Sequence, residues 1–163
     1  MTLKASLAYS APGKMMISGE YAVLFDFPAL VMAVDCRAKT TLHPAEKLTV
    51  KGIHDQCFEV VKADNKIEIL GATPQDQLEL FEVALNYFYE FQPLPTFEIN
   101  INTSSFFDAE GRKMGLGSSA AATVSLTAAL LRTQTGKNPA PNDTRLHAQA
   151  IHHRLNEGYG SGA

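Results

Sequence analysis

The sequence has few of the features that mark several large classes of protein. Only two of its 163 residues are cysteines, Cys36 and Cys57, and neither has the spacing of a metal ligand. A disulfide framework or a zinc cluster is therefore not expected, and both thiols are predicted to lie in the core. No apolar run approaches the ~20 residues that a membrane-spanning helix needs, and the N-terminus does not read as a secretory signal. We therefore expect a cytoplasmic protein with no membrane partner.

The chain also has no large excess of charge of either sign. Its 14 basic and 17 acidic residues give a formal net charge of −3 and are spread along the sequence. Nucleic-acid-binding domains usually carry a basic patch, so nucleic acid is not an expected partner. The 45% of apolar and 19% of charged residues are typical of about one soluble globular domain.

Strands are predicted where apolar residues alternate with polar ones between turn residues. This pattern occurs at residues 3–10, 37–42, 48–53, 57–61, 66–70 and 96–102. Ala11-Pro12-Gly13 is expected to end the first of these strands. The strongly apolar residues 21–34 are expected to run through the core.

Three helices are predicted from apolar residues at helical spacing and from capping residues. The first should begin at Thr73 and Pro74 and end before Pro93. The second should cover residues 120–132 and stop at Gly136. The third should be capped by Asn142 or Asp143 and bury one stripe of side chains, which is Leu146, Ala150, Ile151 and Leu155.

The most informative stretch is residues 114–122, which read Met-Gly-Leu-Gly-Ser-Ser-Ala-Ala-Ala. Gly115 and Gly117 allow a sharp turn that brings backbone N–H groups close to a ligand. Ser118 and Ser119 are expected to cap the helix that follows. Free N–H groups at the positive end of a helix dipole suit a phosphate. On this stretch alone, a tight turn that only caps a buried helix remains an equal alternative.

Other glycine-containing motifs fit the stretch less well. The Gly-Lys-Ser/Thr ending of a Walker A loop does not occur in the sequence. The Gly115-x-Gly117-x-x-Ala120 spacing satisfies the loose dinucleotide-binding pattern. That pattern needs a strand running directly into the first glycine and an acidic residue about twenty positions on, whereas residues 103–113 form a polar loop, expected to bring Arg112 and Lys113 to the glycines. A nucleophile elbow would need a glycine at position 121, where the chain has alanine.

Three loops of small residues resemble, in order and spacing, those of the GHMP kinases, the superfamily of galactokinase, homoserine kinase, mevalonate kinase and phosphomevalonate kinase. They are residues 11–24, 113–122 and 158–163, and the resemblance covers essentially the whole chain. It implies an α+β fold whose N-terminal half resembles the second domain of ribosomal protein S5, with a mixed sheet packed against helices.

The resemblance also implies ATP and Mg²⁺ as cofactors and a role for individual residues. Lys14 would stabilise charge on the transferred phosphoryl group. Ser119, with Ser118 as a further candidate, would also face Mg²⁺ or a phosphate oxygen. The ATP phosphates would lie on the backbone of Gly115, Leu116, Gly117, Ser118, Ser119 and Ala120. The small-molecule acceptor would be bound by Glu20, Tyr21, Lys113 and Ser161.

Two departures from mevalonate kinases favour phosphomevalonate as the acceptor. Tyr21 stands where mevalonate kinases usually have histidine, and His153 stands where they have a magnesium-binding glutamate. Both residues, and a basic residue at Lys113, resemble phosphomevalonate kinases. A phosphomonoester carries nearly two negative charges and needs added cations more than a general base. Mevalonate remains the alternative acceptor.

In the family, the third loop continues from Ser-Gly-Ala into a catalytic aspartate, whereas the sequence stops at Ala163. We therefore expect residues 1–163 to be an N-terminal ATP-binding domain that lacks the C-terminal half and has no turnover on its own. The face left open would then be available for self-association. A complete, non-catalytic nucleotide-binding module is the rival interpretation, and it predicts no large exposed apolar face.

Overall fold

The computed structural model describes residues 3–52, 56–64, 66–73 and 78–156. Within them the chain forms a six-stranded mixed sheet with α-helices, so the predicted α+β class is confirmed. The strands are β1 (Leu7–Ser18), β2 (Leu30–Pro44), β3 (Thr49–Lys51), β4 (Cys57–Ala63), β5 (Lys66–Ile69) and β6 (Phe97–Asn102). The helices are α1 (Glu79–Tyr89), α2 (Ser118–Thr135) and α3 (Pro141–Leu155), with short 3₁₀ turns η1 (Ala22–Phe25) and η3 (Ser104–Phe106).

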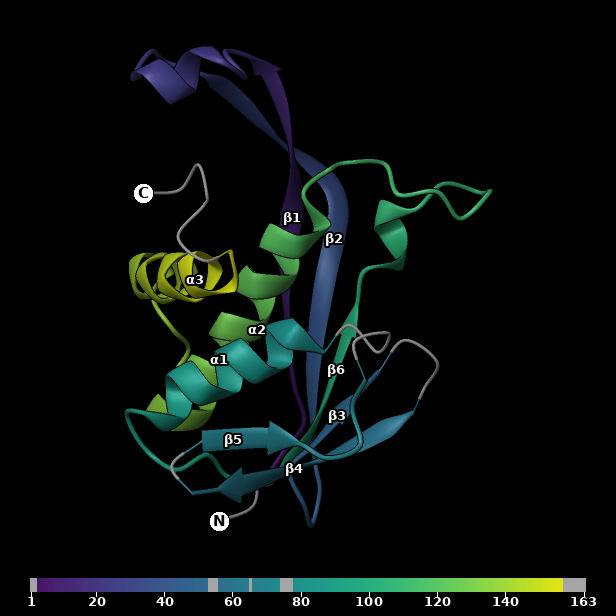
Figure 1. The fold of residues 1–163 in the computed structure, drawn as a ribbon, viewed down its shortest axis with the longest axis vertical. Coiled ribbons are helices and arrows are strands. Elements are labelled where there is room, and N and C mark those ends of the chain that lie inside the picture. The colour runs from purple at the N-terminus through teal and green to yellow at the C-terminus, as the bar shows by residue number, and fades with distance from the viewer. Residues whose placement is uncertain (1–2, 53–55, 65, 74–77, 157–163) are drawn as a thin grey trace.

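The strands lie in the order β1-β2-β6-β3-β4-β5. All neighbours are antiparallel except β3 and β6, which run parallel. The strand β6 therefore joins β1 and β2 to the meander of β3, β4 and β5. The helices gather on one side of the sheet (Figure 1), where α2 contacts β1 and β2 and α1 contacts β5.

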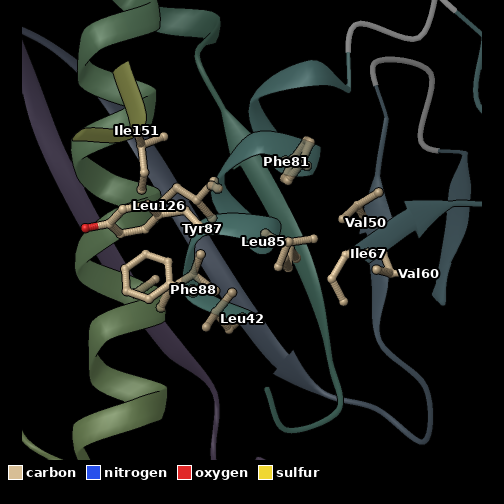
Figure 2. Close-up of a cluster of buried hydrophobic side chains, with 14 of the residues drawn as sticks. Leu42, Val50, Val60, Ile67, Phe81, Leu85, Tyr87, Phe88, Leu126 and Ile151 are labelled. Atoms are coloured by element: carbon tan, nitrogen blue, oxygen red, sulfur yellow. The ribbon is translucent and has the colours of Figure 1, made fainter. Parts of the chain in front are cut away.

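The main core lies between the sheet and the helices (Figure 2). It brings together the fully buried side chains of Leu42 from β2, Phe88 from α1, Leu126 from α2 and Ile151 from α3. Most of the apolar stripe predicted for the first helix is buried here, including Phe81, Leu85 and Phe88, whereas Phe91 at its end is exposed. A fully buried polar contact also crosses this layer, where the hydroxyls of Thr40 and Ser125 are hydrogen bonded at 2.8 Å.

The first strand is longer than the sequence suggested. Pairing of β1 with β2 continues from Leu7↔Leu42 to Ser18↔Leu30, with a shift of register between Pro12 and Gly13. The prediction that Ala11-Pro12-Gly13 ends the strand is therefore wrong. Because β1 is an edge strand, a proline without an N–H group is tolerated in it as a local irregularity.

The outer part of β1 and β2 forms an exposed projection, residues 15–33, which we call the arm. It extends beyond the helices and carries η1 at its tip (purple to blue in Figure 1). Large apolar side chains of the arm are exposed to solvent, among them Tyr21 at 75%, Phe25 at 74% and Phe27 at 65%. The prediction that residues 21–34 run through the core is therefore wrong, because no described element covers this end of the sheet.

Smaller predictions are also corrected. Cys57 is exposed and Cys36 is half-buried, so they are not both core thiols. The helix α1 begins at Glu79, later than the predicted start at Thr73 and Pro74, of which Pro74 lies outside the described residues. The third helix begins at Pro141 after Ala140, because proline is favoured in a first helical turn.

Leu146 was expected to face the core through α3. Its side chain is half-exposed, whereas Thr144, Ala148 and Ile151 are the buried residues of this helix. The prediction is therefore correct for Ile151, and for Ala150, which packs against the core, but wrong for Leu146. None of the helices in the described part of the chain is long and apolar enough to cross a membrane.

Candidate functional site

The glycine loop, residues 114–117, turns directly into the start of α2. Gly115 and Gly117 have φ angles of 71° and 75°, a conformation that residues with a Cβ rarely adopt. Gly117 itself occupies the N-cap position and makes no side-chain cap, so the expected capping role of the serines is not observed. Ser118 is buried and Ser119 is exposed in the first turn. The first N–H groups of any α-helix have no partner within the helix, so this turn presents backbone donors.

Lys14 lies against this loop. Its backbone N–H donates a hydrogen bond of 2.8 Å to the carbonyl oxygen of Leu116. A Cβ added at Gly117 would lie 2.8 Å from Lys14 Cγ, so the lysine side chain passes directly across this glycine. The structure thus brings the predicted cation to the predicted phosphate-binding backbone, although the two are far apart in the sequence.

A cavity of about 830 Å³ opens beside Lys14, between the arm, α2 and α3. The arm contributes apolar side chains such as Met16, Val23 and Val31, and α2 contributes Ala120 and Val124. The wall from α3 is more polar, with Thr144, Arg145, Gln149, His152 and His153. The cavity is large enough for a small-molecule ligand.

The polar wall of α3 is held by contacts within the helix. The guanidinium group of Arg145 donates hydrogen bonds of 2.9 Å to Gln149 Oε1 and to Asn142 Oδ1. His152 lies against the side-chain amide of Asn156. We did not predict Arg145 or Gln149 as site residues. Their spacing places them, with His152, on one helical stripe beside the buried Ala148 and Ile151. The sequence could identify them as cavity residues only if the buried stripe of α3 were already known.

Other predicted site residues lie further out. Glu20 and Tyr21 are exposed in the turn between β1 and η1 and do not line the cavity. Lys113 is exposed and forms an isolated bridge with Phe107, immediately before the glycine loop. Ser161 lies outside the described residues.

Arg112 does not serve the glycine loop, contrary to expectation. Its side chain forms ion pairs with Asp108 at 2.8 Å and Glu110 at 3.1 Å. The Asp108 carboxylate accepts hydrogen bonds from the backbone N–H groups of Arg112 and Glu110 and from the Arg112 side chain. These bonds, above all that from the Arg112 backbone, hold the pKa of Asp108 below its usual value. The Asp108–Arg112 turn is thus held by its own side chains.

Two alternative sites receive no support from the described residues. The strand β6 ends at Asn102, and η3 and the bridged loop separate it from Gly115, so the dinucleotide-binding pattern lacks its leading strand. In the part of the chain that the structure describes, no three histidine, cysteine, aspartate or glutamate residues are grouped to hold a metal ion.

No protein-family model matches the chain. It is 33% identical over 155 residues to a phosphomevalonate kinase of Saccharolobus solfataricus, covering 94% of this chain and 44% of that protein. Its fold matches that of Streptococcus pneumoniae phosphomevalonate kinase in complex with phosphomevalonate and AMPPNP, with a TM-score of 0.70 and 20% identity over 96% of this chain and 45% of that one.

The fold also matches Methanococcus jannaschii mevalonate kinase, with a TM-score of 0.71 and 15% identity over 97% of this chain and 49% of that one. The chain therefore spans about half the length of the proteins that it matches. In sequence and in fold, the chain therefore resembles the N-terminal half of kinases of the GHMP superfamily.

Proposed function

We propose that this chain forms the ATP-binding half of a cytoplasmic kinase that transfers the γ-phosphoryl group of ATP to phosphomevalonate. The observation that carries the proposal is the contact of Lys14 with the glycine loop. There a cation, a helix start and Gly117 with its positive φ lie together, and Lys14 and Ala120 on either side of this contact also line the cavity. The similarity to phosphomevalonate kinases over nearly the whole chain supports it.

The chemistry expected of this arrangement is largely electrostatic. Backbone N–H groups of Gly115 to Ala120 would hold the phosphates of ATP, and the Lys14 ammonium would stabilise the charge that develops during transfer. Mg²⁺ would neutralise phosphate charge here, and such an ion is usually held by one or two carboxylates together with phosphate oxygens and water. The exposed hydroxyl of Ser119 fits this use as a single oxygen ligand, and the described residues offer no carboxylate cluster for a larger metal site.

The choice of phosphomevalonate over mevalonate rests on charge. An acceptor phosphate with nearly two negative charges needs cations near it, and the exposed Lys113 immediately precedes the glycine loop. His153, which stands where a mevalonate kinase would have a carboxylate, lines the cavity with His152. We propose Glu20, Tyr21, Lys113 and Ser161 as the residues that bind the acceptor.

A complete enzyme needs a cover for the arm. Its exposed Tyr21, Leu24, Phe25 and Phe27 form an apolar surface of the kind that marks an interaction site. Because the chain spans about half of its relatives, we propose that a second half of the protein packs on the arm and closes the cavity. On this view the 163-residue chain alone has no turnover and associates with itself through the arm. The exposed arm counts against a complete, non-catalytic nucleotide-binding module.

The test is an assay of ADP release by the full-length protein with phosphomevalonate and, separately, with mevalonate. We expect turnover with phosphomevalonate and a much lower kcat/KM with mevalonate. Lys14→Met should lower kcat by about 100-fold or more, the usual effect of removing one group that stabilises transition-state charge. Lys39→Met is the matched control, since Lys39 is also an exposed lysine of the β1–β2 pair but does not line the cavity.

Each outcome decides a separate part of the proposal. A preference for mevalonate would overturn the choice of acceptor but leave the kinase intact. An equal loss of kcat in Lys14→Met and Lys39→Met would show that Lys14 has no special role in the site. The absence of ADP release with either acceptor would contradict the kinase itself.

A further inference from the structure

Phe106 is fully buried but does not belong to the main core. It lies in a second, smaller cluster with Ala11 of β1, Ala38 of β2 and Ala121 of α2, against which Leu116 of the glycine loop also packs. The other buried members are all alanines, so Phe106 is the one large buried side chain of this cluster among the described residues, with Leu80 and Ile101 packed against it from outside. The glycine loop therefore rests on a cluster whose buried centre contains a single aromatic ring.

The backbone of Phe106 is tied to the same loop. Its carbonyl oxygen accepts a hydrogen bond of 3.0 Å from the N–H of Met114, the first residue of the loop. Its own N–H donates to the Thr103 carbonyl oxygen at 3.0 Å, within the 3₁₀ turn η3. Phe106 thus holds the loop by a backbone hydrogen bond and supports it with its ring.

Gly13 closes the other side of this arrangement. A Cβ added to it would lie 2.5 Å from the Leu116 carbonyl oxygen and 2.6 Å from Cε1 of the Phe106 ring. Real Cβ atoms essentially never approach other atoms so closely, so the strand, the ring and the loop leave no room for one. The next residue, Lys14, donates its N–H to the same Leu116 carbonyl.

We propose that Phe106 and Gly13 are positioning residues that fix the glycine loop against β1. Through Leu116 they set the separation between the Lys14 ammonium and the backbone N–H groups that follow Gly117. Neither residue reaches a ligand itself, since both are buried. The proposal rests on the proposed function for the identity of that ligand, ATP, but its geometry can be tested without it.

The first experiment compares Phe106→Leu with Phe97→Leu in the full-length protein. Phe97 is equally buried but lies in the main core, away from the loop, and it is the matched control. We expect both variants to lower the thermal midpoint. Only Phe106→Leu should raise the KM and Kd for ATP and lower kcat, by roughly tenfold to a hundredfold, because a small misplacement of catalytic groups has effects of this size. The KM for the acceptor should change less.

The second experiment follows amide hydrogen exchange, which does not require ATP. We expect faster exchange at the amides of Met114 and Lys14 in Phe106→Leu than in Phe97→Leu, because these two amides hold the loop. Gly13→Ala should accelerate both amides further. If Gly13→Ala does not fold, the comparison of Phe106→Leu with Phe97→Leu still tests the positioning role.

The outcomes separate the two proposals. If the natural protein binds no ATP but the two amides respond as expected, the proposed function fails and the positioning role stands. If ATP binds and Phe106→Leu changes its KM no more than Phe97→Leu does, the positioning role is overturned. Equal exchange at Met114 and Lys14 in both variants would overturn it as well.

Discussion

Both ends of β2 carry apolar side chains, but the two ends differ in environment. Toward its C-terminal end, Ala38, Thr40 and Leu42 are completely buried beneath α2. At its start, Leu30 is 59% exposed and Met32 is 47% exposed, in the arm. An apolar strand therefore indicates that another element should cover it, but the sequence of the strand does not identify that element. For the inner end that element is α2, and for the arm it is not among the described residues.

The largest expected effect is a loss of folding stability, and it should occur for a core residue but not for a residue of the arm. Leu126→Ala, in the fully buried centre of α2, should lower the free energy of unfolding by about 2–5 kcal/mol. Met32→Ala, on the exposed arm, should change it by less than about 0.5 kcal/mol. Urea unfolding of the 163-residue chain at low concentration measures both.

The same pair in the full-length protein sharpens the contrast. There the effect of Met32→Ala should grow, because the proposed second half would bury this side chain. A small effect in both settings would contradict a cover over this part of the arm.

A smaller effect is expected from the buried hydrogen bond between Thr40 and Ser125, which has no counterpart among the exposed residues of the arm. Ser125→Ala leaves the Thr40 hydroxyl without this partner and should destabilise the protein by about 1–3 kcal/mol. The double variant Thr40→Val with Ser125→Ala removes both hydroxyls and should recover part of the loss. Thermal unfolding of Ser125→Ala, Thr40→Val and the double variant tests this, and strictly additive effects would contradict a coupled pair.

The smallest expected effect concerns the ion pair that joins α1 to α3 at the surface. Arg154 donates to both carboxylate oxygens of Glu90, at 2.7 and 3.1 Å. These bonds lower the pKa of Glu90, although its exposure limits the stabilisation to less than about 1 kcal/mol.

The sign of the pH dependence follows from the lowered pKa. The stabilisation should be fully present above the unfolded-state pKa of glutamate, about 4.3, and should disappear as the pH falls below it. Glu90→Gln should therefore lower the thermal midpoint slightly at pH 7 and not at pH 3. A difference that persists at pH 3 would mean that the packing of the side chain, and not its charge, is responsible.

Much of the fold could be predicted from local sequence. The alternating residues of β6 and the helical stripe of α1 are correctly predicted because one face of each element packs on the core and the other does not. The errors occur where tertiary contacts decide. Pro12 and Gly13 look like the end of a strand, yet pairing with β2 carries the chain through them.

The candidate site shows the same division. The glycine loop could be identified from its residue types and Lys14 from the family resemblance, and the structure brings them together. Phe106 could not be found, because an aromatic residue in a polar loop shows no sign of the glycine that it will meet. The position of Arg145 and Gln149 at the cavity could not be predicted either, because the face of α3 that is buried depends on how α1 and α2 pack against it.

The central position of β6 has a consequence for the order in which the protein folds during synthesis. The pair β1–β2 and the meander β3–β4–β5 each connect neighbouring parts of the chain and can form early. They become one sheet only when β6, which pairs with β2 on one side and with β3 on the other, has left the ribosome. Until then each half presents an unpaired strand edge, so the emerging chain is most exposed to misassembly between the synthesis of β5 and that of β6.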